Sequence, residues 1–225
     1  MNKRLEGEYR EFIYKGEKTP FSPGTLAVMI FCTVLLIAAT FTRLDISYYW
    51  PDFADGLNIV IKKYGLIPQI PVVLFVSAVL GARYGIIVIL FYLITGFFIW
   101  PVFALGGGLE YIKSYFFGYI LGFFAAIIFS GKILYHKYDI KNMLYAAIIG
   151  VLSIHICGIF YSFILSFFNF STYAPNFRLM FSQALYDIIF SFLAILIAKP
   201  LKYIFWIAMK NEPANPKQKK EKAGK

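Results

Sequence analysis

Long apolar runs separated by short polar segments dominate the pattern of this chain. Most of the runs are long enough, at a rise of 1.5 Å per residue, to approach or cross a hydrocarbon layer of ~30 Å. They are Gly24–Thr42, Leu66–Leu80, Tyr84–Trp100, Tyr115–Tyr135, Met143–Phe168 and Leu179–Ala208. The pattern predicts an all-α membrane protein, a bundle of six transmembrane helices over residues 24–208. An interfacial arm at 1–23 and a disordered, Lys-rich tail at 209–225 complete the predicted organisation.

The segments between the runs predict two structured loops on one side of the membrane. Leu44–Gly65 is long, with the aromatic residues typical of a membrane interface and three aspartates. Pro101 ends the third helix, because proline lacks an N–H group and clashes with the preceding turn. Gly106, Gly107 and Gly108 follow, and glycine lets the backbone approach a ligand closely. We expect a re-entrant turn there.

The basic residues predict the orientation of the chain. The side of the membrane that holds the N-terminus carries 17 of the 22 Lys and Arg residues, and the opposite side carries 5. The 17 lie in the arm, at Arg83, in the loop before the fifth run and from Lys199 onward. The positive-inside rule therefore places both termini in the cytoplasm, with Arg83 as a topological anchor. The net charge of +10 is explained by anionic lipid headgroups, so we expect the lipid bilayer as a partner and no nucleic acid.

Composition excludes a soluble domain and gives no sign of a cofactor. Of the residues, 60% are hydrophobic and 15% are charged, whereas soluble domains carry about 25% charged residues. Cys32 and Cys157 lie inside apolar runs, without His or Cys neighbours at metal-ligand spacing. We therefore interpret them as buried, inert thiols and expect neither a metal site nor a cofactor.

Asp187 is the main candidate for chemistry, because it is the only carboxylate within the six runs. It lies about 12 Å along its helix, where a charge must face the bundle interior and meet a partner, a ligand or a proton. The alternative is a structural hydrogen bond to a neighbouring Tyr or Ser. The predicted outer cavity combines the first loop and the Gly106–Gly108 loop with four side chains: Gln69, Tyr119, Gln183 and Asp187.

Other motifs have structural explanations. Gly118 and Gly122 form a pair typical of close helix packing. For His155 we expect a hydrogen-bonded packing role rather than proton or metal chemistry. The glycine run lacks the Lys-Ser/Thr of a phosphate-binding loop, and no nucleophile motif is present, so we expect no enzyme. A membrane-embedded enzyme would require two of Asp187, Glu110 and His155 to converge.

The stretch from Gln69 to Phe123 resembles the BioY family of biotin transporters, the substrate-binding (S) components of energy-coupling factor transporters. The matching features are Gln69, the turn Gly81–Gly85 (GARYG), Trp100–Ala104 (WPVFA), the Gly106–Gly108 loop and Phe117–Phe123 (FGYILGF). Asp187 matches the aspartate that the resemblance implies for the ligand's ureido ring. Phe190 stands at the family's lysine position, and Leu105 at an asparagine position.

The resemblance implies an S component in a bacterial plasma membrane. Its ligand would be biotin or a related small ring compound, and its partners a membrane scaffold subunit and two ATP-hydrolysing subunits. Two other hypotheses remain open. The chain could be an S component for another ring compound, or a membrane structural or assembly protein that kept the fold and lost transport.

Overall fold

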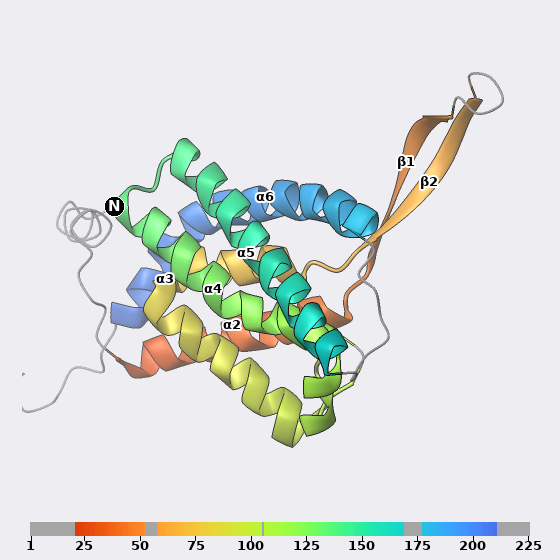
Figure 1. Ribbon diagram of the computed structural model, residues 1–225. Helices are drawn as coiled ribbons and strands as arrows, with labels where there is room; N and C mark the ends of the chain where they lie inside the picture. The colour runs from red at the N-terminus through yellow and green to blue at the C-terminus, as the bar shows by residue number, and fades with distance from the viewer. Residues whose placement is uncertain (1–20, 53–57, 105, 169–176, 211–225) are drawn as a thin grey trace, which may run out of the picture.

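The computed structural model of the protein is a bundle of apolar helices with one projecting β-hairpin (Figure 1). The structure describes residues 21–52, 58–104, 106–168 and 177–210. Nearly all of the predicted tail and of the predicted arm lies outside the described residues, and Met209 and Lys210 of the predicted tail are helical. Those two predictions therefore stay predictions.

Five helices of the described chain are long and apolar enough to cross a membrane. The helices are α2 (Pro23–Phe41), α3 (Gln69–Ile94), α4 (Phe116–His136), α5 (Ile140–Phe167) and α6 (Phe177–Lys210). A π-helical turn, η1 (Thr95–Ile99), extends α3, and a 3₁₀ helix, η2 (Leu109–Lys113), lies in the loop before α4. The chain is a multi-pass membrane protein.

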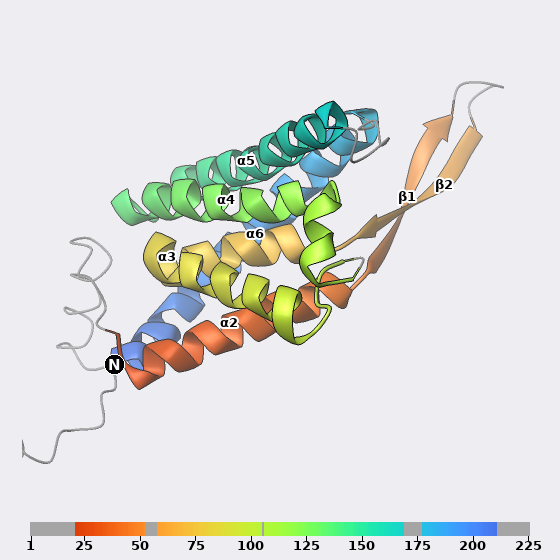
Figure 2. The same cartoon turned by 60° about the horizontal axis from the view of Figure 1, so that its bottom comes forward.

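Helix α3 is interrupted at Gly81, inside the turn that the sequence predicts. Gly81 has a φ of 70°, a conformation that glycine adopts without steric cost, and helical geometry resumes after it. Figure 2 shows the chain turning back sharply there, at the end of the bundle where α2 begins. The longest apolar segment thus consists of two helical parts, which correspond to the predicted second and third runs.

Local signals explain several of the helix ends. Ser22 accepts a hydrogen bond from the Thr25 N–H and caps α2. Asp139 caps α5 in the same way, and its bond from the Asn142 N–H lowers the pKa of the Asp139 carboxyl. Trp100 is extended and ends η1 immediately before Pro101, as predicted.

The predicted loop at Leu44–Gly65 contains an antiparallel hairpin that the sequence interpretation missed. Strand β1 (Leu44–Asp52) pairs with β2 (Asn58–Leu66), with Leu44 opposite Leu66. Because Leu66 belongs to β2, the following helix begins at Gln69 and not at Leu66. Both views show the hairpin projecting away from the helices (Figures 1 and 2).

Two further boundaries differ from the predicted ones. The predicted polar loop Gly131–Asn142 is largely helical, since α4 continues to His136 and α5 starts at Ile140. Helix α6 runs from Phe177 through Pro200 to Lys210 and so extends the predicted run Leu179–Ala208 at both ends. Figure 1 shows the last part of α6 bending toward the start of α2.

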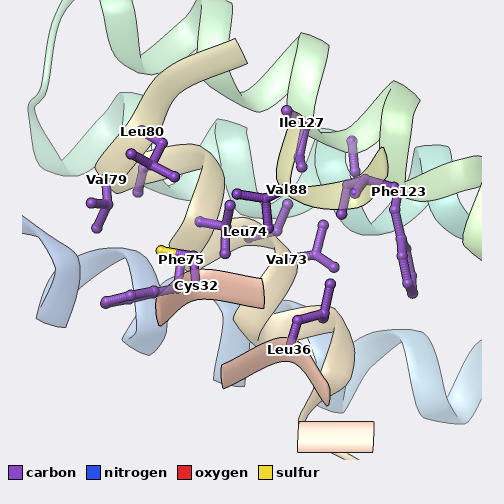
Figure 3. Packing of buried hydrophobic residues seen from close by; sticks show 14 of the residues in the cluster. Cys32, Leu36, Val73, Leu74, Phe75, Val79, Leu80, Val88, Phe123 and Ile127 are labelled. Carbon is purple, nitrogen blue, oxygen red and sulfur yellow. The ribbon is translucent and has the colours of Figure 1, made fainter. Parts of the chain in front are cut away.

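The core is built around the first part of α3, whose side chains are almost entirely buried. Figure 3 shows Val73 and Leu74 of this helix between Leu36 of α2 and the α4 residues Phe123 and Ile127. These apolar contacts hold three helices together around one segment. The placement explains why Gln69–Leu80 shows no polar face in the sequence.

The two described ends of the chain lie together. The Ser22 hydroxyl donates a hydrogen bond to the Met209 carbonyl oxygen at 2.6 Å, which joins the start of α2 to the end of α6. The Gly81 turn and the α4–α5 connection lie at the same end of the bundle, and the hairpin lies at the opposite end (Figure 2).

Candidate ligand-binding site

Asp187 meets His155 in the interior of the bundle. Asp187 lies on α6, His155 on α5, and Asp187 Oδ2 is 3.4 Å from His155 Nε2. Their side chains are 1% and 8% exposed, respectively. The prediction that Asp187 faces the bundle interior is confirmed by this burial.

This polar pair carries no hydrogen bond among the described residues. Both Asp187 oxygens, both His155 ring nitrogens and the Ser191 hydroxyl are buried and unpartnered. The expected hydrogen bond of His155, and the alternative of a structural hydrogen bond from Asp187 to a Tyr or Ser, have no counterpart among the described residues, and the two side chains face each other instead. Buried polar groups without partners are uncommon in folded proteins and call for a specific explanation.

Tyr119 adds an aromatic ring from α4 to this pair. Its ring meets the His155 imidazole edge to face, with centroids 5.7 Å apart and an interplanar angle of 88°. Gly158 provides the space, since a Cβ at that position would lie 2.7 Å from the Tyr119 ring. Three helices thus bring Tyr119, His155 and Asp187 together, and two of these three were predicted site residues.

Gln183 and Glu110 lie outside this group. Gln183 is exposed, one helical turn before Asp187 on α6. Glu110 is exposed in η2 and accepts a 2.7 Å bond from the Lys113 ammonium group. The convergence of two of the three groups, which a membrane-embedded enzyme would require, therefore occurs for Asp187 and His155, and Glu110 takes no part in it.

Gln69 belongs to a second polar group, around the Tyr92 hydroxyl. Gln69 Nε2 donates to Tyr92 Oη at 2.9 Å, and Tyr92 donates to the Val102 carbonyl oxygen at 3.3 Å. The Thr40 hydroxyl of α2 lies 3.3 Å from the same oxygen. The network joins α2, both parts of α3 and the loop after Pro101, so the Gln69 amide is already engaged in the fold.

Replacing Tyr92 by Phe should lower the melting temperature. The change removes the acceptor of the Gln69 amide and the donor to Val102, and a polar group left unpaired in this way costs ~1–3 kcal/mol. Differential scanning fluorimetry of the purified protein measures the effect. The control is Tyr145→Phe, since Tyr145 is 58% exposed on α5. Equal melting temperatures for the two variants would contradict a stabilising role of the network.

The glycine loop folds back onto the end of α3. Gly108 has a φ of 78°, and its N–H donates to the Gly96 carbonyl oxygen at 2.8 Å. A Cβ on Gly107 would lie 2.7 Å from that oxygen and 2.5 Å from Pro101 Cα. Both glycines are therefore required by the fold of the loop, and a ligand contact from them stays a prediction.

Aromatic rings connect this loop to α4 and α5. Successive ring centroids lie 4.6–5.7 Å apart along Tyr92, Phe103, Phe97, Phe117 and Tyr161, with Tyr111 beside Phe103. The Tyr161 hydroxyl donates to the Ile112 carbonyl oxygen at 2.6 Å and ties α5 to η2.

Sequence reasoning missed His155 and Ser191 as neighbours of Asp187. Ser191 carried a usable signal, because a position four residues after Asp187 lies on the same helix face. His155 is 32 positions away on another helix, and its contact depends on packing. Across the described ranges, no group of three or more His, Cys, Asp or Glu side chains is placed to hold a metal ion.

Comparison with known proteins gives the family. A sequence model of the BioY family matches residues 56–205, more than half of the chain. The chain belongs to the BioY family. This is a family of transporter substrate-binding components and not of enzymes, which favours ligand binding over catalysis for the Asp187–His155 pair.

Two further similarities support the fold. The S-component for biotin from an ECF-type ABC transporter matches with a TM-score of 0.57 and 20% identity, covering 79% of this chain and 90% of that structure. A 21.2 kDa protein encoded in the psbX-ycf33 intergenic region of Cyanophora paradoxa is 29% identical over 126 residues. That alignment covers 56% of this chain and 66% of the relative.

Proposed function

We propose that this BioY-family protein captures biotin from the outer side of a bacterial plasma membrane, as the S component of an energy-coupling factor transporter. The observation that carries the proposal is the buried Asp187 carboxylate, whose two oxygens have no hydrogen-bond partner within the described part of the chain. The similarity in fold to the S-component for biotin supports the same ligand. A cyclic urea offers the N–H donors that an acceptor-only carboxylate requires.

The proposed topology has six membrane crossings and cytoplasmic termini. The described ends of the chain meet through Ser22 and Met209, so an even number of crossings agrees with the structure. The reversal at Gly81 lets α3 supply two crossings. The positive-inside rule then places this end of the bundle in the cytoplasm and the hairpin and glycine loop outside.

The proposed site follows from this orientation. Asp187 and Tyr119 bind the ligand inside the bundle, and Gln183 lies one turn closer to the outer side. Gln69 and the backbone at Gly107 and Gly108 border the entrance. The chain shows no phosphate-binding motif, so we propose that a scaffold subunit and ATP-hydrolysing subunits supply the energy for release into the cell.

Calorimetric titration of the purified protein with biotin tests the proposal. We expect saturable binding with a nanomolar Kd, roughly 12 kcal/mol of binding free energy. Lipoic acid is the matched control ligand, because it has the same valerate chain without the ureido ring, and it should not bind. A protein that binds neither compound would contradict the proposal and favour the structural or assembly role, which Phe190 at the family's lysine position also favours.

A further inference from the structure

The polar atoms around Asp187 form one buried cluster contributed by two helices. Asp187 and Ser191 are four residues apart and therefore share a face of α6, and His155 reaches Asp187 from α5. The residues Asp187, His155 and Ser191 are 1%, 6% and 0% exposed. All five of their side-chain N and O atoms lack a hydrogen-bond partner among the described residues.

Ser191 differs from the other buried Ser and Thr side chains in the described helices, which all take part in hydrogen bonds. Thr33, Thr40, Ser130 and Ser162 each donate a hydrogen bond to the carbonyl oxygen four residues earlier. The Ser191 hydroxyl makes no such bond, although that common arrangement needs no other residue. Its hydrogen-bonding capacity is therefore available to a molecule inside the bundle.

We infer that His155 and Ser191 are ligand-binding residues which, with Asp187, hold a small ring bearing adjacent N–H and C=O groups. This inference rests on the proposed function and adds two side chains to the site. Ionised aspartate only accepts hydrogen bonds, whereas neutral histidine and serine each both donate and accept. A ring with donors and an acceptor side by side satisfies all three residues at once.

The same chemistry disfavours other ligand heads. An anionic group placed here would face the Asp187 carboxylate in a site of low dielectric constant, where like charges repel strongly. A purely apolar ring would leave the five polar atoms without partners. The charged end of a ligand such as biotin must therefore point away from this cluster, toward another part of the site.

The arrangement also fixes the His155 ring. The groups that face it are the Asp187 carboxylate from α6 and the Tyr119 ring from α4, which meets it edge to face. Gly158 leaves room for the Tyr119 ring beside α5. Because the Tyr119 ring packs against it, the imidazole has a defined orientation. Its ring nitrogens make no hydrogen bond to a described residue, so they can bind a ligand.

Biotin titration of four variants of the full chain tests the inference. His155→Leu should weaken biotin binding about ten-fold or more and Ser191→Ala by a smaller factor, as expected for lost hydrogen bonds. His155→Gln keeps a donor and an acceptor and should recover part of the affinity. Ser162→Ala is the matched control, because the Ser162 hydroxyl already bonds to Gly158, and its affinity should equal that of the wild type.

Thermal unfolding without ligand separates binding from a purely structural role. The side chains of His155 and Ser191 make no hydrogen bonds with the residues that the structure describes, so the melting temperatures of their variants should equal or exceed that of the wild type. Wild-type affinity in both His155→Leu and Ser191→Ala would overturn the inference and leave the proposed function standing. Failure of the wild type to bind biotin would overturn both.

Discussion

Asparagine in place of Asp187 should lower the affinity for biotin at least ~10-fold, because one hydrogen bond to a charged acceptor contributes ~1.5–3 kcal/mol. The two N–H groups of a cyclic urea lie on either side of its carbonyl and diverge, so the carboxylate accepts from one of them, whereas the asparagine amide offers that N–H an uncharged acceptor or turns a donor toward it. The substitution preserves shape and volume. The loss of binding therefore reports on hydrogen bonding and charge.

Calorimetry with biotin measures this effect, and Glu110→Gln is the matched control. Glu110 is a carboxylate on the surface that pairs with Lys113, so its neutralisation should leave the affinity unchanged. The unliganded Asp187→Asn protein should melt no lower than the wild type, since neither carboxylate oxygen has a hydrogen-bond partner among the residues described. Undiminished biotin binding by Asp187→Asn would remove Asp187 from the site.

The helices were predictable because each one is a local pattern. The length of an apolar run marks each helix. The helix ends are determined by residues close to them, such as the caps at Ser22 and Asp139 and the stop before Pro101. The β-hairpin was missed because a strand is stabilised by its partner, and the pairing of Leu44 with Leu66 joins positions 22 residues apart. An aromatic, β-branched segment of this kind is compatible with both a membrane interface and a strand.

The candidate site was predictable only where one residue was informative by itself. Asp187 drew attention because a carboxylate inside an apolar run is costly in any arrangement of the helices. The roles of Gln69 and His155 depended on their neighbours: Gln69 donates a hydrogen bond to Tyr92, and His155 lies beside Asp187 without a side-chain hydrogen bond to any described residue. Tyr92 and Asp187, the two neighbours, each stand within a long apolar run, so no local pattern indicates which residues face one another.

Replacing Gly122 by Leu should disrupt both the fold and the site. Gly122 lies where α4 packs closely on α5, and a Cβ there would be 2.7 Å from Ile154 Cα and 3.0 Å from the Ile154 carbonyl oxygen. This confirms the close packing predicted from the Gly118–Gly122 pair. Backbone atoms cannot rotate aside as a side chain can, so the two helices must separate. Overpacking in protein cores costs ~1–3 kcal/mol and sometimes more, and contact with backbone places this variant at the upper end.

The consequence extends to ligand binding because Ile154 immediately precedes His155. Displacing α5 at Ile154 moves the imidazole relative to Asp187, so any Gly122→Leu protein that folds should bind biotin weakly. The loss of melting temperature, measured by fluorimetry, and the loss of biotin affinity, measured by calorimetry, should both be larger for Gly122→Leu than for Gly122→Ala. Leu121→Ala, at a neighbouring position that is 38% exposed, should keep near wild-type values in both measurements. A Gly122→Leu protein with wild-type stability and affinity would show that α4 and α5 do not pack as closely as the structure has them.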